Sequence, residues 1–120
     1  MQSFADHDPA GLGDGMRKRV AIARALTLDP RYVLFDEPTT SLDPVSARRV
    51  DSLIRELSDK LHVTSIVVSH DLASIFSIAD RIVFLYQGVV RKVGTPAEFK
   101  SSDDPIVDQF INGRAQGPIA

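Results

Sequence analysis

Cysteine is absent from the 120-residue sequence, which excludes disulfide bonds and thiolate metal sites and fits a reducing compartment. Long apolar runs are missing too, and none approaches the roughly 20 residues that a membrane-spanning helix needs. The N-terminus lacks the charged and then apolar pattern of a signal peptide. An excess of positive charge is also lacking, since the formal net charge is −2, and this argues against a nucleic-acid partner. We expect a soluble, cytoplasmic chain with one modest core.

The most informative stretch that is present is a short apolar run ending in two carboxylates, at residues 32–38. A continuous apolar run between two prolines predicts a strand buried on both faces, as in parallel sheets. Asp36 ends this strand and Glu37 follows it, at the edge where open α/β sheets bind ligands. A carboxylate at Asp36 can hold Mg²⁺ through water, and one at Glu37 can polarise an attacking water. The alternative is a strand followed by an acidic loop.

A helix and a second strand are predicted to follow. Asp43 is a suitable N-cap, Pro44 suits the first helical position, and apolar residues recur at helical spacing to about Lys60. Residues 63–68 are rich in β-branched side chains and predict a second buried strand. Strand, helix and strand form a βαβ unit, so the carboxyl ends of both strands point the same way.

His70 lies just after the second strand, as Asp36 and Glu37 lie at the end of the first. If the two strands are close in the sheet, the βαβ arrangement places His70 near both carboxylates. A lone histidine is more often structural than catalytic, but its relation to this acidic pair favours a catalytic role.

The N-terminal stretch offers two further candidates. Residues 1–15 hold few apolar side chains and are expected to form an irregular loop. His7 lies there between two aspartates, but it lacks a recognisable metal-ligand spacing, and a solvated loop is the preferred interpretation. A helix is predicted over residues 16–28, and its glycine-rich entry turn exposes backbone N–H groups that favour an anion. The alternative, which this stretch alone favours, is an ordinary amphipathic helix after a flexible loop.

Short elements are expected after His70. They are a helix over 72–79, strands over 81–86 and 89–93, a helix beginning at residue 96 and a helix over 105–111. Gln87 and Gly88 predict a hairpin turn, and Thr95 predicts a helix cap. The last helix carries apolar side chains that need a partner surface, and residues 114–120 are expected to be irregular.

Several of these features, from about Pro9 onward, resemble the motifs of the ATP-binding-cassette (ABC) ATPases. The stretch that resembles the signature motif consists of Leu12, Gly13, Asp14, Gly15 and Met16. Residues 32–36 resemble the Walker B strand, Glu37 occupies the catalytic-glutamate position, residues 41–43 resemble the D-loop, and His70 occupies the H-loop position. One such motif is weak evidence, but four in the family's order are specific.

The resemblance implies an α/β fold, namely the C-terminal part of a P-loop NTPase domain of ABC type. Parallel strands with flanking helices would be followed by a C-terminal β-hairpin and short helices. In the family, two such domains enclose two ATP molecules with Mg²⁺. By resemblance Asp36 helps to position Mg²⁺, Glu37 polarises the attacking water, and His70 contacts the γ-phosphate. The implied nucleotide-binding positions are Leu12, Gly13, Asp14, Gly15, Met16, Ser41 and Asp43.

One departure from the family pattern is that the 120 residues contain no G-x-x-x-x-G-K-[ST] motif, the P-loop that cradles the phosphates. We therefore expect residues 1–120 to be a partial nucleotide-binding domain, with residues 94–120 as a C-terminal extension. ATP hydrolysis then requires a missing N-terminal half that carries the P-loop. The alternative is a non-catalytic interaction module or an inactive remnant of an ABC ATPase.

A second departure lies in the signature motif, which reads Leu-Gly-Asp-Gly-Met where the family has Leu-Ser-Gly-Gly-Gln or -Met. Gly13 lacks the serine hydroxyl, and Asp14 places a carboxylate where an anion docks. Two like charges about 4 Å apart cost roughly 4 kcal/mol at an effective dielectric of about 20. This weakens the expectation that the motif activates a partner's ATP. Alternatively, Asp14 is only a helix cap.

A subfamily is suggested by Gly-Met-Arg-Lys-Arg at residues 15–19 and by the C-terminal residues 110–118, which resemble the Mla/Mce-type lipid-transport ATPases. The resemblance implies a second ATPase subunit and an integral membrane permease as partners. It also implies a cytoplasmic position at the inner membrane, reached through the permease. The alternative is an importer or exporter ATPase for another solute.

Overall fold

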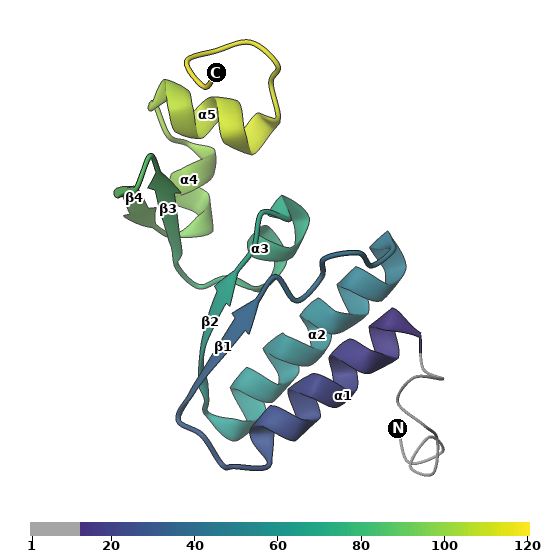
Figure 1. Ribbon diagram of the computed structural model, residues 1–120. Coiled ribbons are helices and arrows are strands. Elements are labelled where there is room, and N and C mark those ends of the chain that lie inside the picture. The colour runs from purple at the N-terminus through teal and green to yellow at the C-terminus, as the bar shows by residue number, and fades with distance from the viewer. Residues whose placement is uncertain (1–12) are drawn as a thin grey trace. The chain divides into compact units, whose positions relative to one another are not determined.

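The computed structural model describes residues 13–120 (Figure 1). Of the loop predicted over residues 1–15, residues 1–12 with His7 and Leu12 lie outside the described residues, and so does the side chain of Asp14. The chain divides into two compact units, residues 1–74 and 75–120. No helix within residues 13–120 is both long and apolar enough to cross a membrane.

The helices and strands of the described residues follow the predicted order. They are α1 (Asp14–Leu26), β1 (Tyr32–Asp36), α2 (Pro44–Leu61), β2 (Thr64–Val68), α3 (Leu72–Ile78), β3 (Ile82–Tyr86), β4 (Val89–Gly94), α4 (Pro96–Lys100) and α5 (Pro105–Asn112). The largest difference from the prediction is at α1, which begins at Asp14 rather than Met16.

The first unit contains the predicted βαβ arrangement. β1 and β2 pair in parallel, with Val33 opposite Ser65 and Asp36 opposite Val68. α2 connects the two strands, and α1 lies beside α2 (Figure 1). The carboxyl ends of both strands therefore meet at one edge, as the sequence predicts.

The prediction that β2 is a buried strand is wrong, because none of its residues is buried. The prediction that β1 is buried on both faces is wrong too. Burial alternates along the strand: Phe35 is 7% exposed, whereas Leu34 is 67% exposed. Tyr32 shares the open face with Leu34, and Val33 shares the buried face with Phe35. Alternation of this kind marks a sheet that is covered on one side only.

α2 covers the buried face of this sheet. Ser65 of β2 pairs with Val33 of β1, so it lies on the buried face of the sheet. Its hydroxyl lies 2.6 Å from the hydroxyl of Ser58 in α2. Val50 and Ile54 of α2 are buried. Within the described residues of this unit no helix covers the opposite face, so its apolar side chains stay exposed.

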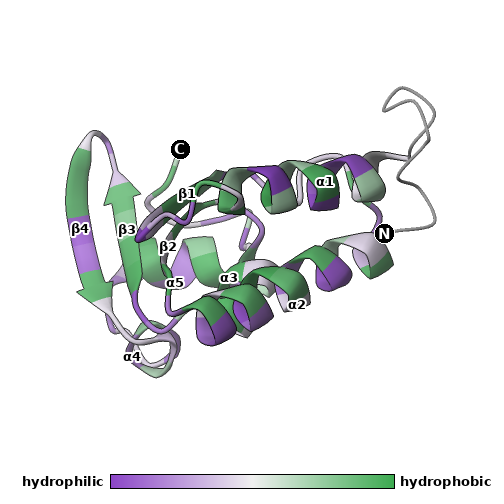
Figure 2. Ribbon diagram, turned by 90° about the horizontal axis from the view of Figure 1, so that it is seen from below, coloured by the Kyte–Doolittle hydropathy of each residue, from purple (hydrophilic) through white to green (hydrophobic). Residues whose placement is uncertain are grey.

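The second unit contains the predicted hairpin. β3 and β4 pair antiparallel, and Tyr86 lies opposite Val89 across a two-residue turn. Gln87 and Gly88 both have positive φ, 51° and 80°, as a type I′ turn requires. Figure 2 shows β3 as hydrophobic along most of its length and β4 with a hydrophilic middle.

α4 and α5 follow the hairpin; α4 begins at the predicted cap Thr95, and α5 begins at Asp104, a cap that was not predicted. The Thr95 hydroxyl accepts a hydrogen bond from the Glu98 N–H at 3.2 Å, and the Asp104 carboxylate accepts one from the Ile106 N–H at 2.9 Å. The apolar face of α5 finds partners within this unit, because Val107 is fully buried and the rings of Phe110 and Phe84 lie 5.1 Å apart.

The tail over residues 114–120 forms no helix or strand, as predicted, but it is held against α5. The buried amide of Gln109 accepts a hydrogen bond from the Ile119 N–H at 2.6 Å. It also donates to the Arg114 carbonyl at 3.2 Å. One buried side chain therefore holds both ends of the tail.

Candidate functional site

Glu37 and His70 meet at the carboxyl ends of the two parallel strands. His70 Nδ1 lies 3.0 Å from Glu37 Oε1. The strands bring them together because each residue follows the end of its own strand, where Asp36 pairs with Val68. The prediction that His70 lies near both carboxylates is confirmed for Glu37.

The backbone of Glu37 is strained and held in place. Its φ is 50°, in the left-handed region that residues other than glycine rarely adopt. The Glu37 N–H donates to the Val68 carbonyl at 2.7 Å, and the ammonium of Lys18 donates to the Glu37 carbonyl at 3.4 Å. Strain that neighbouring groups maintain in this way is concentrated at functional sites.

The Glu37 carboxyl is ionised in this arrangement. The hydrogen bond with His70 lowers the pKa of Glu37, and partial burial opposes the shift. The charge of His70 and a hydrogen bond from the Thr40 hydroxyl, 3.2 Å from Oε2, lower the pKa further. An ionised carboxylate only accepts hydrogen bonds, so the proton between the pair belongs to His70 Nδ1.

Asp36 is the last residue of β1, and its side chain is exposed. No group of three histidine, cysteine or acidic residues within residues 13–120 is arranged to hold a metal ion. Mg²⁺ is usually bound by one or two carboxylates together with waters and substrate phosphates. Asp36 therefore fits a Mg²⁺ ion that is bound jointly with a nucleotide, and not an ion held by protein groups alone.

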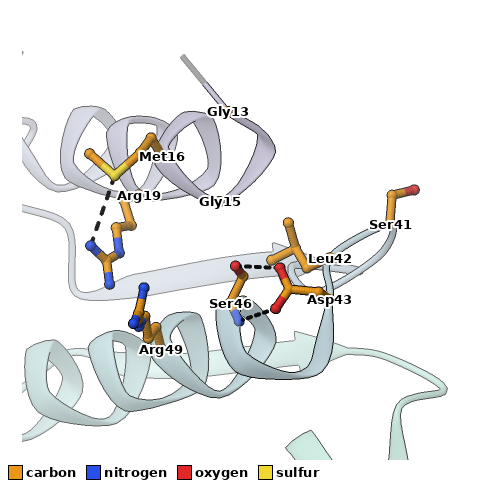
Figure 3. Close-up of a pocket in the computed structure, with 9 residues that line it drawn as sticks. All are labelled: Gly13, Gly15, Met16, Arg19, Ser41, Leu42, Asp43, Ser46 and Arg49. Carbon is orange, nitrogen blue, oxygen red and sulfur yellow. Dashed lines mark hydrogen bonds between the residues drawn. The ribbon is translucent and has the colours of Figure 1, made fainter.

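A pocket of about 380 Å³ lies between the N-terminal end of α1 and the loop that precedes α2 (Figure 3). It is lined by Gly13, Gly15, Met16, Arg19, Ser41, Leu42, Asp43, Ser46 and Arg49. Five positions predicted to bind nucleotide, Gly13, Gly15, Met16, Ser41 and Asp43, thus face one cavity. Leu12 and the side chain of Asp14 lie outside what the structure describes.

The polar groups of this pocket favour an anion. Gly13 is the N-cap of α1; its backbone is extended, and within the described residues no side-chain hydrogen bond caps this helix end. The first hydrogen bond within the helix runs from the Arg17 N–H to the Gly13 carbonyl. The preceding N–H groups have no partner within the helix. Arg19 of α1 and Arg49 of α2 point toward one another between the two helices (Figure 3). A helix N-terminus and two guanidinium groups together attract negative charge.

Asp43 also lines the pocket, but its carboxylate caps α2 as predicted. Oδ2 accepts from the N–H groups of Val45 and Ser46, both at 3.0 Å, and Oδ1 accepts from the Ser46 hydroxyl at 2.6 Å. These bonds, led by the one from the Ser46 hydroxyl, lower the pKa of Asp43. Ser41, two residues before this cap, has a φ of 66°, which is also left-handed.

Sequence reasoning did not single out Arg19 and Arg49, because both lie on polar helix faces. A signal was present for Arg19, which is four residues after Gly15 and so lies one turn along the same side of α1. No comparable signal marks Arg49, since its place beside Arg19 depends on how the two helices pack.

Comparison with known proteins identifies the family. The family model described as ABC transporter matches residues 1–40. The phospholipid-transport ATP-binding protein MlaF of Haemophilus influenzae is 43% identical over 111 residues, which cover 92% of this chain and 42% of MlaF. This chain belongs to the ABC transporter ATPases. CysA 1 of Chromobacterium violaceum, a sulfate/thiosulfate import ATP-binding protein, is 43% identical over 98 residues, covering 82% of this chain and 27% of CysA 1.

Solved ABC structures agree with the predicted α/β fold of a P-loop NTPase. Clostridium perfringens cbiO1, part of the cbiONQ transporter complex, matches with a TM-score of 0.80 and 30% identity over 96% of this chain and 45% of cbiO1. A dimeric ABC cassette in a post-hydrolysis state with ADP and phosphate matches with a TM-score of 0.67 and 34% identity over 80% of this chain and 41% of the cassette. This ABC chain thus spans less than half the length of each of these four relatives.

Proposed function

We propose that this chain is part of the ATP-binding subunit of an ABC transporter, and that the subunit couples ATP hydrolysis to membrane transport of lipids. The observation that carries the proposal is the Glu37–His70 pair, 3.0 Å apart at the carboxyl ends of β1 and β2. A strained, ionised carboxylate beside an imidazole at this edge suits the activation of a water.

In this proposal each site residue has one task. Asp36 holds Mg²⁺, which supplies charge stabilisation to the phosphates when it is bound. Glu37 polarises the attacking water, for which its carboxylate must be ionised, as the His70 contact ensures. His70 contacts the γ-phosphate through its exposed ring.

The pocket at the start of α1 is proposed to face the γ-phosphate of ATP that a second ATPase subunit holds. One wall is the N-terminal end of α1, with Gly13, Gly15 and Met16, and the loop residues Ser41 and Asp43 line the pocket as well. The two arginines add positive charge, which attracts phosphate. The ADP-bound dimer among the structural relatives supports a dimeric arrangement of this kind.

The proposed partners are this second subunit, an integral membrane permease, and a segment that carries the P-loop. Residues 1–120 then form part of a nucleotide-binding domain, in which residues 94–120 are a C-terminal extension. We place the assembly on the cytoplasmic side of the inner membrane, where the permease holds it, and propose no nucleic-acid partner.

Lipid is the proposed cargo because MlaF, named for intermembrane phospholipid transport, is 43% identical over 92% of this chain. A second candidate is another solute, since CysA 1, named for sulfate and thiosulfate import, is also 43% identical over a shorter stretch. UgpC of Vibrio vulnificus, named for glycerol-3-phosphate import, is 39% identical over the whole chain.

The test of the ATPase proposal uses a joined protein, in which this chain follows an N-terminal segment of an ABC ATPase that carries the P-loop. We expect the 120-residue chain alone to show no Mg²⁺-dependent ATP turnover, because it contains no P-loop motif. The joined protein should hydrolyse ATP. A joined protein that folds and binds ATP but does not hydrolyse it would favour the alternative, a non-catalytic interaction module.

A related prediction concerns the signature motif. In the joined protein, Gly13→Ser together with Asp14→Gly should raise turnover severalfold, because the changes add a hydroxyl donor and remove a carboxylate where phosphate docks. ATP affinity measured in the open state should hardly change, since the P-loop provides most first contacts. Steady-state turnover and equilibrium ATP binding check both parts. Unchanged turnover would show that Asp14 is only a helix cap.

A further inference from the structure

A partly buried polar cluster joins the residues that follow Glu37 and His70. We call it the Asp71 cluster, and its members are Thr39, Arg48, Asp51, Asp71 and Ser74. They come from three places in the first unit: the turn after β1, helix α2, and the beginning of α3. Thr39, Asp51 and Ser74 are buried.

Asp71 is the centre of this cluster. Its Oδ2 accepts three hydrogen bonds, from the Thr39 hydroxyl at 3.1 Å, Arg48 Nη2 at 2.9 Å and the Ser74 hydroxyl at 3.1 Å. Its Oδ1 accepts from the Ser74 N–H at 3.3 Å. Burial raises the pKa of Asp71, but the bonds from Ser74 and Thr39 and the charge of Arg48 outweigh it and lower the pKa. One ionised carboxylate thus ties the three elements together.

Stability alone does not explain this cluster. Arg48 faces two carboxylates, Asp71 at 2.9 Å and Asp51 at 3.1 Å. Asp51 is only 2% exposed, and burial raises its pKa. A buried ionic group such as Asp51 is often no more stabilising than an apolar one of similar size, because removing a charge from water is costly. A role in fixing position accounts better for two acids and one arginine at this place.

The cluster joins the two turns that carry the functional pair. Thr39 is two residues after Glu37, and Asp71 directly follows His70. The His70 side chain is 78% exposed, so packing does not hold its ring. An exposed ring of this kind can adopt several rotamers, so its contact with Glu37 depends on where its own backbone lies. The bond between Asp71 and Thr39 links the two backbone turns beyond the strand ends, which β1–β2 pairing and the bond from Glu37 to Val68 already hold together.

We propose that Asp71, through Thr39 and Arg48, is a positioning residue that holds the His70 ring against Glu37. The effect of this positioning on ATP hydrolysis rests on the proposed function. The positioning itself does not, because His70 and Glu37 are in contact within this chain. Asp71 touches neither reacting group and acts through the backbone of its neighbour.

The test measures which ring nitrogen of His70 carries the proton in the 120-residue chain. Nitrogen chemical shifts of the imidazole are recorded at one fixed pH of about 8.5, where an ordinary imidazole, with a pKa of about 6.5, is neutral. The contact with ionised Glu37 selects the Nδ1–H form, whereas a free ring favours Nε2–H. We expect Nδ1–H as the majority form in the unaltered chain and as the minority form in Asp71→Ala.

Milder variants keep the test decisive if Asp71→Ala fails to fold. Thr39→Val preserves side-chain shape and removes only the hydroxyl, so it should also lower the Nδ1–H fraction, and Thr39→Ser should restore it. Asp59→Ala is the matched control, because Asp59 pairs with Arg55 at 2.6 Å on an exposed helix surface. It should leave the tautomer unchanged.

An Nδ1–H majority that persists in a folded Asp71→Ala or Thr39→Val chain would overturn the positioning role. Failure of the proposed function is a separate result. If these variants shift the tautomer while the joined protein shows no ATP turnover, the positioning role stands and the ATPase proposal fails. If both hold, Thr39→Val in the joined protein should lower kcat and leave KM for ATP nearly unchanged.

Discussion

Glu37→Gln in the joined protein is expected to lower ATP turnover by roughly 100-fold or more, the usual contribution of a general base. Glutamine keeps the shape of the side chain but cannot accept a proton from water. The backbone bonds of residue 37, to the Val68 carbonyl and from Lys18, do not involve the carboxylate and remain. The loss should therefore fall on kcat, with ATP binding preserved. Steady-state hydrolysis and equilibrium nucleotide binding measure the two quantities.

Glu56→Gln is the matched control for this prediction. Glu56 lies on the exposed surface of α2 and pairs with Lys60 at 2.6 Å. Neutralising it should leave turnover within the error of the assay, because exposed ion pairs of this kind contribute little. If Glu37→Gln retained turnover within a few-fold of the unaltered joined protein, Glu37 would not be the group that activates water.

Ile54→Ala is expected to destabilise the 120-residue chain by about 3 kcal/mol, which lowers the ratio of folded to unfolded chain roughly 100-fold. Ile54 is 2% exposed and belongs to the stripe of α2 that covers the β1–β2 sheet. Its removal costs the transfer energy of the lost methyl and methylene groups and leaves a cavity. Urea unfolding followed by circular dichroism measures the change in the free energy of unfolding.

Ile66→Ala makes the same substitution on the other face of that sheet. Ile66 is 56% exposed and lies opposite Leu34 on the open face. Its replacement should cost less than about 1 kcal/mol, the range of strand preferences at exposed sites. Equal losses for Ile54→Ala and Ile66→Ala would contradict the one-sided burial of the sheet and would indicate that its open face is covered in solution.

Local features of the fold could be predicted from the sequence because they depend on neighbouring residues. Asp43 and Thr95 each cap the helix that the following proline begins, as predicted. Gln87 and Gly88 form the predicted two-residue turn, since the backbone of such a turn accepts few residue types. The position of His70 beside Glu37 was predictable for a similar reason, because a βαβ unit points both strands the same way.

The sequence by itself thus determined the order of elements, their caps and turns, and the edge at which Glu37 and His70 meet. Only the tertiary structure decided that β1 is covered on one face, that Arg19 lies beside Arg49, and that Asp71 joins Thr39 to Arg48. These contacts join residues far apart in the chain. A periodic pattern shows that a side chain is apolar or charged, but the surface it meets depends on how separate elements pack.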